Sequence, residues 1–593
     1  MYLSTLKLWN FRKYGAPGEI DIKTPHLQVS FKQGLNVLVG QNDSGKTAII
    51  DAIKLVLKTH AYEWIRPTKE DFYKDSTVFR IELEIAGLTD SEASHFVEWL
   101  GWKDDKPLLR IIFQARLKDG VVLSSDVKAG QSVDGIQLTS EAKDYLKTTY
   151  LRPLRDANND LTAGRNSRFS QILEGHKLLK KEEGVVHELE SIAENANAET
   201  KKWFLSSNGG DNSSKAQIID VIDGFIHDFI NDGFSSDITL VPPEIHTILE
   251  KLSLGINEDA FLGLGTLNRL YMAAELLHLK NPARDSLNLC LIEELEAHLH
   301  PQSQLKVISS LQKQAGVQFI LTTHSPNITS QLDLANDGVN LLMCINESVF
   351  SLKSGETKLT TEDYNYLKTF LDVTKSNLFF AKGLFLVEGW AEEIIIPALA
   401  SKMGFDFTKK ELTIVNVGST AYLRFAHIFM PNDGKSMGVK VAAITDLDVP
   451  PINGMFDENE EEKQEKGKIE KFEVENNGDV KLYIANHWTL EWCLFTSPAT
   501  KECFMDAVAA VHSKTPEFKK VITEGSDISV YNEEIFKNKL IEKLLPGTPS
   551  KLDKVAVAYA FVERIKNVKM QLTETDESIS YLVKAINHVC KEG

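Results

Sequence analysis

The sequence predicts an α/β protein built from several packing units. Its 593 residues exceed the roughly 100 to 200 residues of one domain, so about three to five units are expected. Apolar runs typical of buried strands lie at 35–39, 289–292 and 317–321, and residues at helical spacing follow the first of them. Beyond residue 370 a new alternation of strand and helix patterns begins, which indicates a further α/β unit.

Composition narrows the classes of protein to which the chain can belong. Hydrophobic residues make up 42% and charged residues 25%, close to the globular averages, which excludes a disordered or fibrous chain. The 84 acidic residues outnumber the 66 basic ones and give a net charge of −18, so attraction of the whole molecule to a polyanion is excluded. Any contact with nucleic acid must therefore come from a local basic groove or from bound metal ions.

Cysteine usage and apolar segments bear on the cellular compartment. The five cysteines are scattered without a CxxC pair, which is typical of a reducing compartment and argues against a disulfide scaffold or a thiolate zinc site. The amino terminus lacks the apolar block of a signal peptide, and no stretch approaches 18 uninterrupted apolar residues. We expect a cytoplasmic protein with no membrane contact.

A phosphate-binding loop is predicted near the amino terminus. The apolar run 35–39 leads into the segment GQNDSGKT at 40–47, after which apolar residues recur at helical spacing. The segment matches G-x-x-x-x-G-K-[ST], whose glycines let backbone N–H groups surround phosphate oxygens at the start of a helix. We predict that Lys46 reaches the β- and γ-phosphates of ATP and that Thr47 binds Mg²⁺. The other expected nucleotide-binding residues are Gly40, Asn42 and Gly45.

Two further apolar runs supply the remaining groups of a nucleotide site. The run 289–292 ends in Glu293 and Glu294, and adjacent acids at a strand end are costly unless a positive group lies beside them. We assign Glu293 to the Mg²⁺ shell and Glu294 to the base that orients water. The run 317–321 leads to His324, which we assign as a sensor of the γ-phosphate, although such a histidine taken alone is more often structural.

In this order the motifs resemble the ABC-type ATPase heads of RecF-like and SMC-like proteins. Residues 8–12 (LWNFR) are similar to their first strand, and 293–301 (EELEAHLHP) to their EEPE-x-x-LHP segment, with Leu295 in place of the usual proline. Their signature motif is best matched by 262–268 (LGLGTLN), which lacks the usual LSGG and nominates Gly265 as a nucleotide contact. The resemblance implies ATP held between two heads, and hence at least a homodimer.

A long insertion separates the two halves of this head. From 170 to 206 the composition turns to Leu, Lys, Glu and Ala, and 216–230 is helical again after a turn rich in Gly and Ser. We predict that this insertion is a helical hairpin used for dimerisation, with a merely solvated helix face as the alternative. Just before it, 150–157 (YLRPLRDA) resembles a segment of OLD-family (overcoming lysogenisation defect) proteins. There, Arg152 and Arg155 are equally candidates for phosphate contacts and for structural salt bridges.

A second set of acidic residues is predicted near the carboxyl end. The buried run 383–387 delivers Glu388 into a helix, and Glu392, four residues further on, can face the same point. A second buried strand ends before Asp446 and Asp448, which the alternation of an extended chain turns to one side. Because acids gathered at the ends of two parallel strands repel without cations, we expect hard divalent ions, Mg²⁺ or Mn²⁺, between them.

This arrangement resembles the Toprim fold of topoisomerases, primases and OLD nucleases, whose marks are a glutamate after the first strand and a DxD after a later one. Gly418 is similar to the turn after that fold's intervening strand. In OLD nucleases a further glutamate and a lysine complete the site, and the matching residues are Glu491 and Lys554, with Lys551 as a rival. An ABC-type head followed by a Toprim domain is similar to OLD-family ATP-dependent endonucleases, as in Gabija or retron-associated effectors.

The resemblance implies a domain organisation and a reaction. The expected units are an amino-terminal part of the ATPase head at 1–165, the helical insertion at 166–240, the rest of the head at 241–370, and the Toprim domain with carboxyl-terminal helices at 371–593. The reaction is two-metal phosphodiester hydrolysis, with a further ion accompanying ATP. Glu388, Glu392 and Asp446 are assigned to the first ion and Asp448 with Glu491 to the second, while Lys554 offsets charge on the phosphate.

Three functional hypotheses follow. The first is a DNA endonuclease or nickase of a prokaryotic antiphage defence system, with a helicase or a reverse transcriptase and its msDNA as partner. The second is a non-nucleolytic SMC-like ATPase clamp, and the third is a nuclease acting on RNA such as tRNA. No G-x-S-x-G elbow supports a serine nucleophile. The charged run 457–471 is expected to be a solvated loop or lid.

Overall fold

Three large sheets, together with the two-stranded sheet β19-β20, organise the described part of the chain. The computed structural model describes residues 1–60, 65–124, 126–153, 160–165, 167–174, 176–179, 185–205, 221–227, 236–256, 263–280, 286–451, 455–473, 478–522 and 529–591. Its strands are β1 Tyr2–Trp9, β2 Leu27–Ser30, β3 Leu35–Val39, β4 Val78–Ala86, β5 Leu100–Lys103, β6 Lys106–Lys118, β7 Val121–Ser124, β8 Lys128–Ala129, β9 Ile136–Gln137, β10 Thr149–Leu151, β11 Leu289–Ile292, β12 Gln318–Thr323, β13 Val339–Ile345, β14 Ser348–Ser351, β15 Gly383–Val387, β16 Leu412–Asn416, β17 Lys440–Thr445, β18 Val480–Ile484, β19 Val521–Ile522 and β20 Ser529–Val530.

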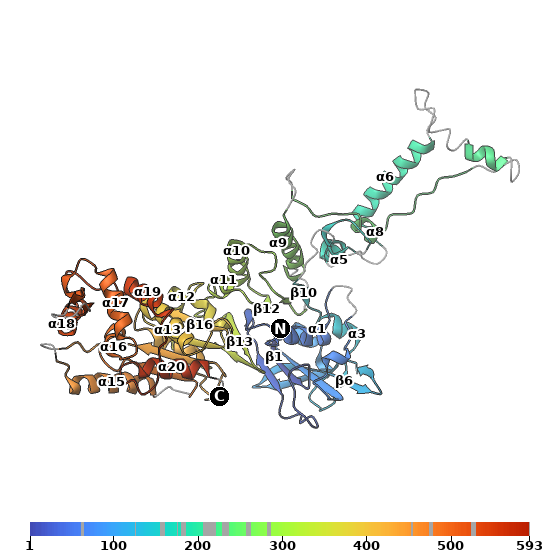
Figure 1. The fold of residues 1–593 in the computed structure, drawn as a ribbon. Helices are drawn as coiled ribbons and strands as arrows, with labels where there is room; N and C mark the ends of the chain where they lie inside the picture. Colours follow the sequence, from blue (N-terminus) through green and yellow to red (C-terminus); the bar gives the residue numbers. More distant parts are fainter. Residues whose placement is uncertain are drawn as a thin grey trace.

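Helices cover these sheets and form the carboxyl-terminal layer (Figure 1). They are α1 Lys46–Leu57, α2 Asp90–Ser94, α3 Ser140–Asp144, α5 Arg168–Glu174, α6 Glu188–Leu205, α8 Ile245–Leu249, α9 Leu264–Glu275, α10 Pro301–Gln312, α11 Pro326–Thr329, α12 Thr361–Phe370, α13 Trp390–Lys402, α14 Tyr422–Ala426, α15 Glu458–Glu473, α16 Leu490–Thr496, α17 Lys501–Val511, α18 Glu533–Leu544, α19 Lys554–Ile565 and α20 Ser580–Cys590.

The nucleotide half combines an antiparallel and a parallel sheet. The first runs β2-β1-β4-β6-β8-β9, with β5 and β7 also paired to β6. The second runs β10-β11-β12-β3-β13-β14 and is parallel except at β14. All residues of β3 and β12 are buried, as the continuous apolar runs predict for central parallel strands. Helix α1 packs between the two sheets in a shared apolar core.

The carboxyl-terminal half is built on a parallel sheet in the order β16-β15-β17-β18. A layer that includes α13, α17 and α19 covers one side, where Phe385 and Val387 point into its core. The opposite side contributes Leu384 and Leu386 to a core that also contains Leu321 of the nucleotide half. The two α/β units are thus joined by continuous apolar packing.

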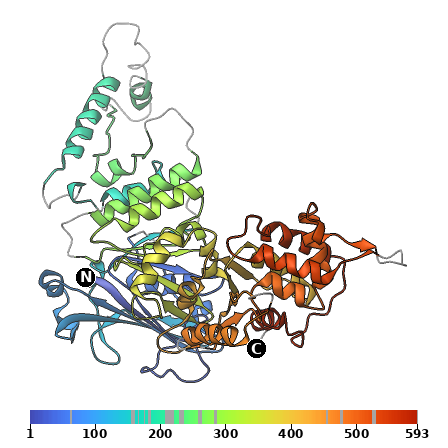
Figure 2. The same cartoon turned by 90° about the vertical axis from the view of Figure 1, so that its left-hand side faces the viewer.

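The predicted insertion projects from this body. Figures 1 and 2 both show α6 extending away from the sheets, with α5 and α8 at its base. Residues 221–227 are also helical, whereas much of the expected hairpin, including 206–220, lies outside the described residues. The charged run 457–471 forms most of helix α15, so its expectation as a loop was wrong. Ion pairs between Glu and Lys three or four residues apart stabilise the exposed side of this helix.

Two expectations about composition can be compared with the structure. All five cysteines are free, so no disulfide links the strands. Among the described residues, none of the helices is both long enough and apolar enough to cross a bilayer.

Candidate active sites

The phosphate-binding loop lies between β3 and α1, as the sequence predicts. Gly40 and Gly45 have φ angles of 147° and 98°, which L side chains rarely adopt. A Cβ on Gly45 would lie 2.0 Å from the hydroxyl of Tyr14, and one on Gly40 would lie 2.4 Å from the carbonyl oxygen of Cys344. Glycine is therefore needed at both positions for conformation and for space.

The side chain of Lys46 folds back onto the phosphate-binding loop and contacts the oxygens of that loop. Its Nζ donates to the carbonyls of Gly40 (3.0 Å) and Gln41 (2.6 Å) and to Ser44 Oγ (3.0 Å). Burial lowers its pKa, while neighbouring acids, Glu294 among them, oppose that shift. The ammonium thus lies where loop oxygens satisfy it, and a triphosphate would have to draw it away from them. Thr47 and Asn42 are exposed at the loop.

The acidic strand end lies beside this loop. Strand β12 pairs in parallel with β3 on one side and with β11 on the other, so Lys46, Glu293 and His324 follow strands that end at the same edge. Burial raises the pKa of Glu293 to about 7, with the charge of Asp51 adding to the effect. Tyr150 Oη donates to Glu293 at 3.3 Å. A carboxyl group with a raised pKa is suited to binding a cation, because the cation would restore the charged form of the group.

Glu294 and His324 complete the predicted nucleotide group. Glu294 has a φ of 45°, and its backbone N–H donates to Thr322 Oγ1 at 3.0 Å. Burial lowers the pKa of His324, and the nearby charge of Lys46 lowers it further. The sequence missed the role of Glu296, whose carboxylate accepts from the His324 backbone N–H at 2.6 Å and from Thr323 Oγ1 at 2.7 Å.

The signature segment and its surroundings are only partly described. Gly265 lies in the first turn of α9, where an added Cβ would approach the His298 carbonyl oxygen to 3.0 Å. Its contact with a nucleotide of a second copy stays a prediction. Arg168 in α5 pairs with Glu275 in α9 and so fixes the signature helix to the base of the insertion. Arg155 lies outside the described residues, whereas Arg152 lies within them.

The second group of predicted acids gathers at the carboxyl edge of the β15–β17 pair. These strands are parallel neighbours, with Leu386 opposite Ala443, so Glu388 and Asp446 follow adjacent strand ends. Glu388 accepts a hydrogen bond from Thr445 Oγ1, and Asp446 Oδ1 accepts one from the backbone N–H of Leu490 at 2.8 Å. The predicted acids from separate stretches are therefore brought together.

The pKa values of these carboxyl groups show that negative charge is crowded at this edge. Burial raises the pKa of Glu392 to about 7, and the charges of Glu491 and Glu388 add to the effect. Burial also raises the pKa of Asp446, with Glu491 again contributing, and that of Glu388. Such crowding favours bound cations.

Lys554 supplies one positive charge. It begins α19, and its Nζ lies 2.9 Å from Glu491 Oε2, while Asp446 and Glu392 also raise its pKa against the effect of burial. This contact favours Lys554 over Lys551 as the lysine of the site. Both carboxylate oxygens of Glu491 are buried, and among the described residues Lys554 is the cation that pairs with this carboxylate, at Oε2.

Asp448 differs from its expected orientation. Its φ of 65° breaks the extended alternation on which the sequence argument relied, and its side chain is half exposed. Lys468 of α15 lies 3.0 Å from Asp448 Oδ2 and was not singled out from the sequence, because it is one lysine among many in a charged run. Within the part of the chain that the structure describes, no group of three or more His, Cys, Asp and Glu side chains is arranged to hold a metal ion.

The donor set nevertheless fits a hard cation. The side chains at the edge are carboxylates and a threonine hydroxyl, the ligands that Mg²⁺ and Mn²⁺ prefer. The raised pKa values of Glu392 and Asp446, beside a buried Glu491 that pairs with one ammonium, are what such a site shows when its negative charge is incompletely balanced. The roles of the individual carboxylates, and the number of ions, stay predictions.

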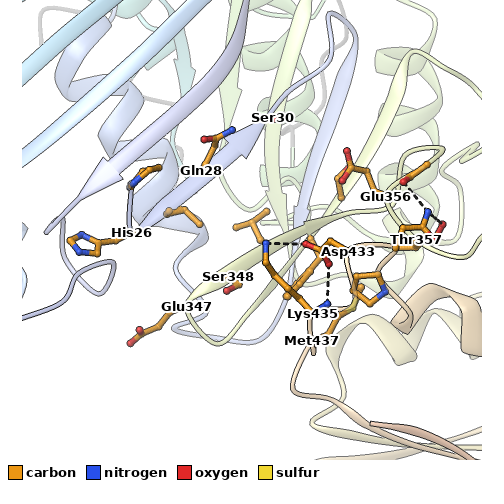
Figure 3. Close-up of a pocket in the computed structure, with 18 residues that line it drawn as sticks. His26, Gln28, Ser30, Glu347, Ser348, Glu356, Thr357, Asp433, Lys435 and Met437 are labelled. Atoms are coloured by element: carbon orange, nitrogen blue, oxygen red, sulfur yellow. Dashed lines mark hydrogen bonds and ion pairs between the residues drawn. The ribbon is translucent and has the colours of Figure 1, made fainter. Parts of the chain in front are cut away.

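A direct contact links the phosphate-binding loop to the segment that leads into strand β15, whose end carries the second site. Gln41 Nε2 donates to the carbonyl of Phe380 at 3.0 Å, three residues before β15 begins. A cavity of about 350 Å³ lies at this junction, lined by residues that include Gln41, Cys344 and Lys382. A larger cavity, of about 750 Å³, lies between β2, β14 and residues 431–437 and contains none of the predicted site residues (Figure 3).

Comparisons with known proteins agree with this pairing of sites. The family model "Overcoming lysogenization defect protein-like, TOPRIM domain" matches residues 379–448, which include the first four acids of the second site. The "AAA ATPase domain" model matches 1–183 and 136–329, more than half of the chain, with the phosphate-binding loop and the acidic strand end.

Two named relatives align with half or more of this chain. Endonuclease GajA of Bacillus cereus (strain HuB5-5) is 23% identical over 91% of this chain and 93% of its own length. The Retron Ec83 probable ATPase of Escherichia coli is 24% identical over 52% of this chain and 67% of its own. Among solved structures, an SMC head bound to the winged-helix domain of ScpA covers 60% of this chain and 99% of its own, at 17% identity and a TM-score of 0.35, too low to add to the assignment.

The fold and the two sites define an ATPase unit joined to a Toprim unit, the architecture of an ATPase-linked nuclease. The chain belongs to the OLD family of ATPase–Toprim enzymes.

Proposed function

We propose that this protein is an ATP-regulated, metal-dependent endonuclease that nicks or cleaves DNA in antiphage defence. The observation that carries the proposal is the convergence of Glu388, Glu392, Asp446 and Glu491 with Lys554 at one sheet edge, beside a separate nucleotide site. The similarity to a protein named an endonuclease over nearly the full length of both chains supports it.

The residues of the second site have distinct parts in the proposed reaction. Divalent ions, when bound, would activate water and stabilise the departing oxygen. Glu388, Glu392 and Asp446 would hold the first ion, and Asp448 with Glu491 the second. Lys554, which pairs with Glu491, would offset charge on the substrate phosphate.

The residues of the first site would bind ATP and Mg²⁺. Lys46 would leave the loop carbonyls for the phosphates, Glu293 and Thr47 would hold the ion, and Glu294 would orient water, with His324 close to the γ-phosphate. We propose that the protein acts as a homodimer through its signature segment and insertion, and that a helicase or reverse transcriptase encoded nearby supplies the trigger.

Cleavage of supercoiled plasmid DNA with Mg²⁺ or Mn²⁺ tests the proposal. Asp446→Ala is expected to abolish nicking and leave ATP hydrolysis intact, since the residue belongs to the other half of the molecule. Asp433→Ala, an acid of the same half that pairs with Lys435 on the surface, is the matched control and should nick like the wild type. Equal nicking by Asp446→Ala would place the active site elsewhere.

Two alternatives remain distinguishable in the same assay. The non-nucleolytic clamp is favoured by one observation, that the described residues hold no ready-made metal cluster. It predicts no cleavage of any nucleic acid by the wild type at any Mn²⁺ concentration. A nuclease specific for RNA predicts cleavage of tRNA but not of plasmid, in both cases lost in Asp446→Ala.

A further inference from the structure

Helix α15 places a lysine at the end of the DxD strand. Lys468 Nζ lies 3.0 Å from Asp448 Oδ2 and 3.5 Å from Thr445 Oγ1, and it also donates to the carbonyl oxygen of Asp446. An ammonium has three N–H donors, and here each has an oxygen within reach. The Lys468 side chain is only 15% exposed, so these oxygens form a defined binding position for one positive charge.

The three oxygens around Lys468 are those that a hard cation would use. They combine a carboxylate, a backbone carbonyl and a hydroxyl, a set typical of Mg²⁺ or Mn²⁺ ligands. Asp448 is one of the two residues of the DxD pair, and Thr445 also contacts Glu388. A metal ion and the ammonium of Lys468 therefore cannot both occupy this position.

The rest of α15 is anchored independently of Lys468. Phe472 is 3% exposed within the apolar core. Glu461 lies 3.4 Å from His487, and Phe456, just before the helix, packs against the ring of Trp492. The long, flexible Lys468 side chain can thus turn away while the helix stays in place.

We propose that Lys468 is an internal cation that occupies the second metal position of the Toprim site and competes with the divalent ion for Asp448. The inference rests on the proposed function, because it assumes that these carboxylates hold metal. Loading of the site then requires Lys468 to release Asp448, so the protein resists activation at low divalent-ion concentration.

Direct measurement of Mn²⁺ binding tests the proposal without reference to cleavage. Mn²⁺ titrations of the full-length, nucleotide-free protein are followed by electron paramagnetic resonance. Lys468→Met keeps the apolar stem and removes the charge, and it is expected to bind Mn²⁺ roughly three- to tenfold more tightly, the factor gained when a partly exposed ion pair no longer competes. Adding Asp448→Ala to this variant should cancel the gain.

Lys466→Met is the matched control. Lys466 lies on the same helix but is 65% exposed and pairs with Glu462, so its loss should leave Mn²⁺ affinity unchanged. Lys468→Gln, a second neutral variant, should show the same gain as Lys468→Met, which guards against a local folding defect in one of them.

The outcomes separate failure of this inference from failure of the proposed function. Unchanged or weaker Mn²⁺ binding in both Lys468 variants, at a site still lost in Asp446→Ala, refutes the competition and leaves the metal site intact. Absence of any Mn²⁺ binding that depends on Asp446, in wild type and variants alike, refutes the metal site itself and the competition with it.

Discussion

Replacing Arg168 by leucine is expected to destabilise the helix that carries the signature segment. Arg168 Nε and Nη2 lie 2.6 Å and 2.7 Å from the two carboxylate oxygens of Glu275, and the side chains are 6% and 0% exposed. Removing one partner of a buried ion pair leaves the other charge without compensation, at a cost of about 3–5 kcal/mol. Because both oxygens of Glu275 are paired by the same guanidinium, we expect a value within this range and not below it.

Hydrogen exchange of the α9 amides measures this effect locally. A decrease of about 3 kcal/mol in the free energy of local opening makes amide exchange roughly 150-fold faster. The double variant Arg168→Leu, Glu275→Leu should recover most of the loss, because two apolar side chains replace the pair without an unpaired charge. Lys202→Leu is the control, since its pair with Glu199 on α6 is exposed and contributes at most about 1 kcal/mol. Equal exchange rates in the Arg168 and Lys202 variants would refute the reasoning, as would a double variant no better than the single one.

Three other predictions concern the nucleotide site, the pH dependence and the core. Lys46→Ala should abolish ATP hydrolysis in a phosphate-release assay, and full turnover would show that the loop does not bind the phosphates. Hydrogen bonds from Thr360 and His427 outweigh burial and hold the pKa of Asp363 below its usual value, so its stabilising contribution is present above pH about 4 and disappears as the pH falls through the lower folded value. In acid denaturation, Asp363→Asn should therefore lose that part of the pH dependence of stability. An unchanged pH dependence below about pH 4 would contradict the lowered pKa of Asp363. Phe385→Ala, in a fully buried position, should lower the free energy of unfolding by about 3–5 kcal/mol in denaturant titrations, and a loss under 1 kcal/mol would contradict its place in the core.

The strands that position both sites were predictable because their signals are local. Continuous apolar runs ending in a glycine loop or in acids mark buried parallel strands, and 35–39 and 383–387 form β3 and β15 with the predicted bounds. The helix after Gly389 begins at Trp390, which puts Glu392 in its first turn as expected.

Contacts between distant segments were not predictable in the same way. The ion pair of Arg168 with Glu275 joins residues 107 apart, and neither stands out from the other charged residues of its helix. Lys468 has the same sequence environment as Lys466, and only the packing of α15 against the DxD strand distinguishes them. The left-handed backbone at Asp448 also has no sequence signal, because the extended alternation assumed for the DxD pair ends with β17 at Thr445.

The described contacts form a route by which a change at one site would reach the other. The side chain of Gln41 in the phosphate-binding loop holds the carbonyl of Phe380, and Phe379 beside it belongs to the apolar core that also contains Leu384 and Leu386 of β15. If ATP draws Lys46 away from the Gln41 carbonyl, the loop that holds Phe380 loses one of its own constraints. A change in affinity transmitted this way must be reciprocal, so metal bound at the Toprim edge would alter ATP affinity by the same factor as ATP alters metal affinity. Competition by Lys468 for Asp448 would lower the intrinsic metal affinity and leave the coupling factor between the two sites unchanged. The strength of coupling and the threshold for metal loading would then be separable properties of the molecule.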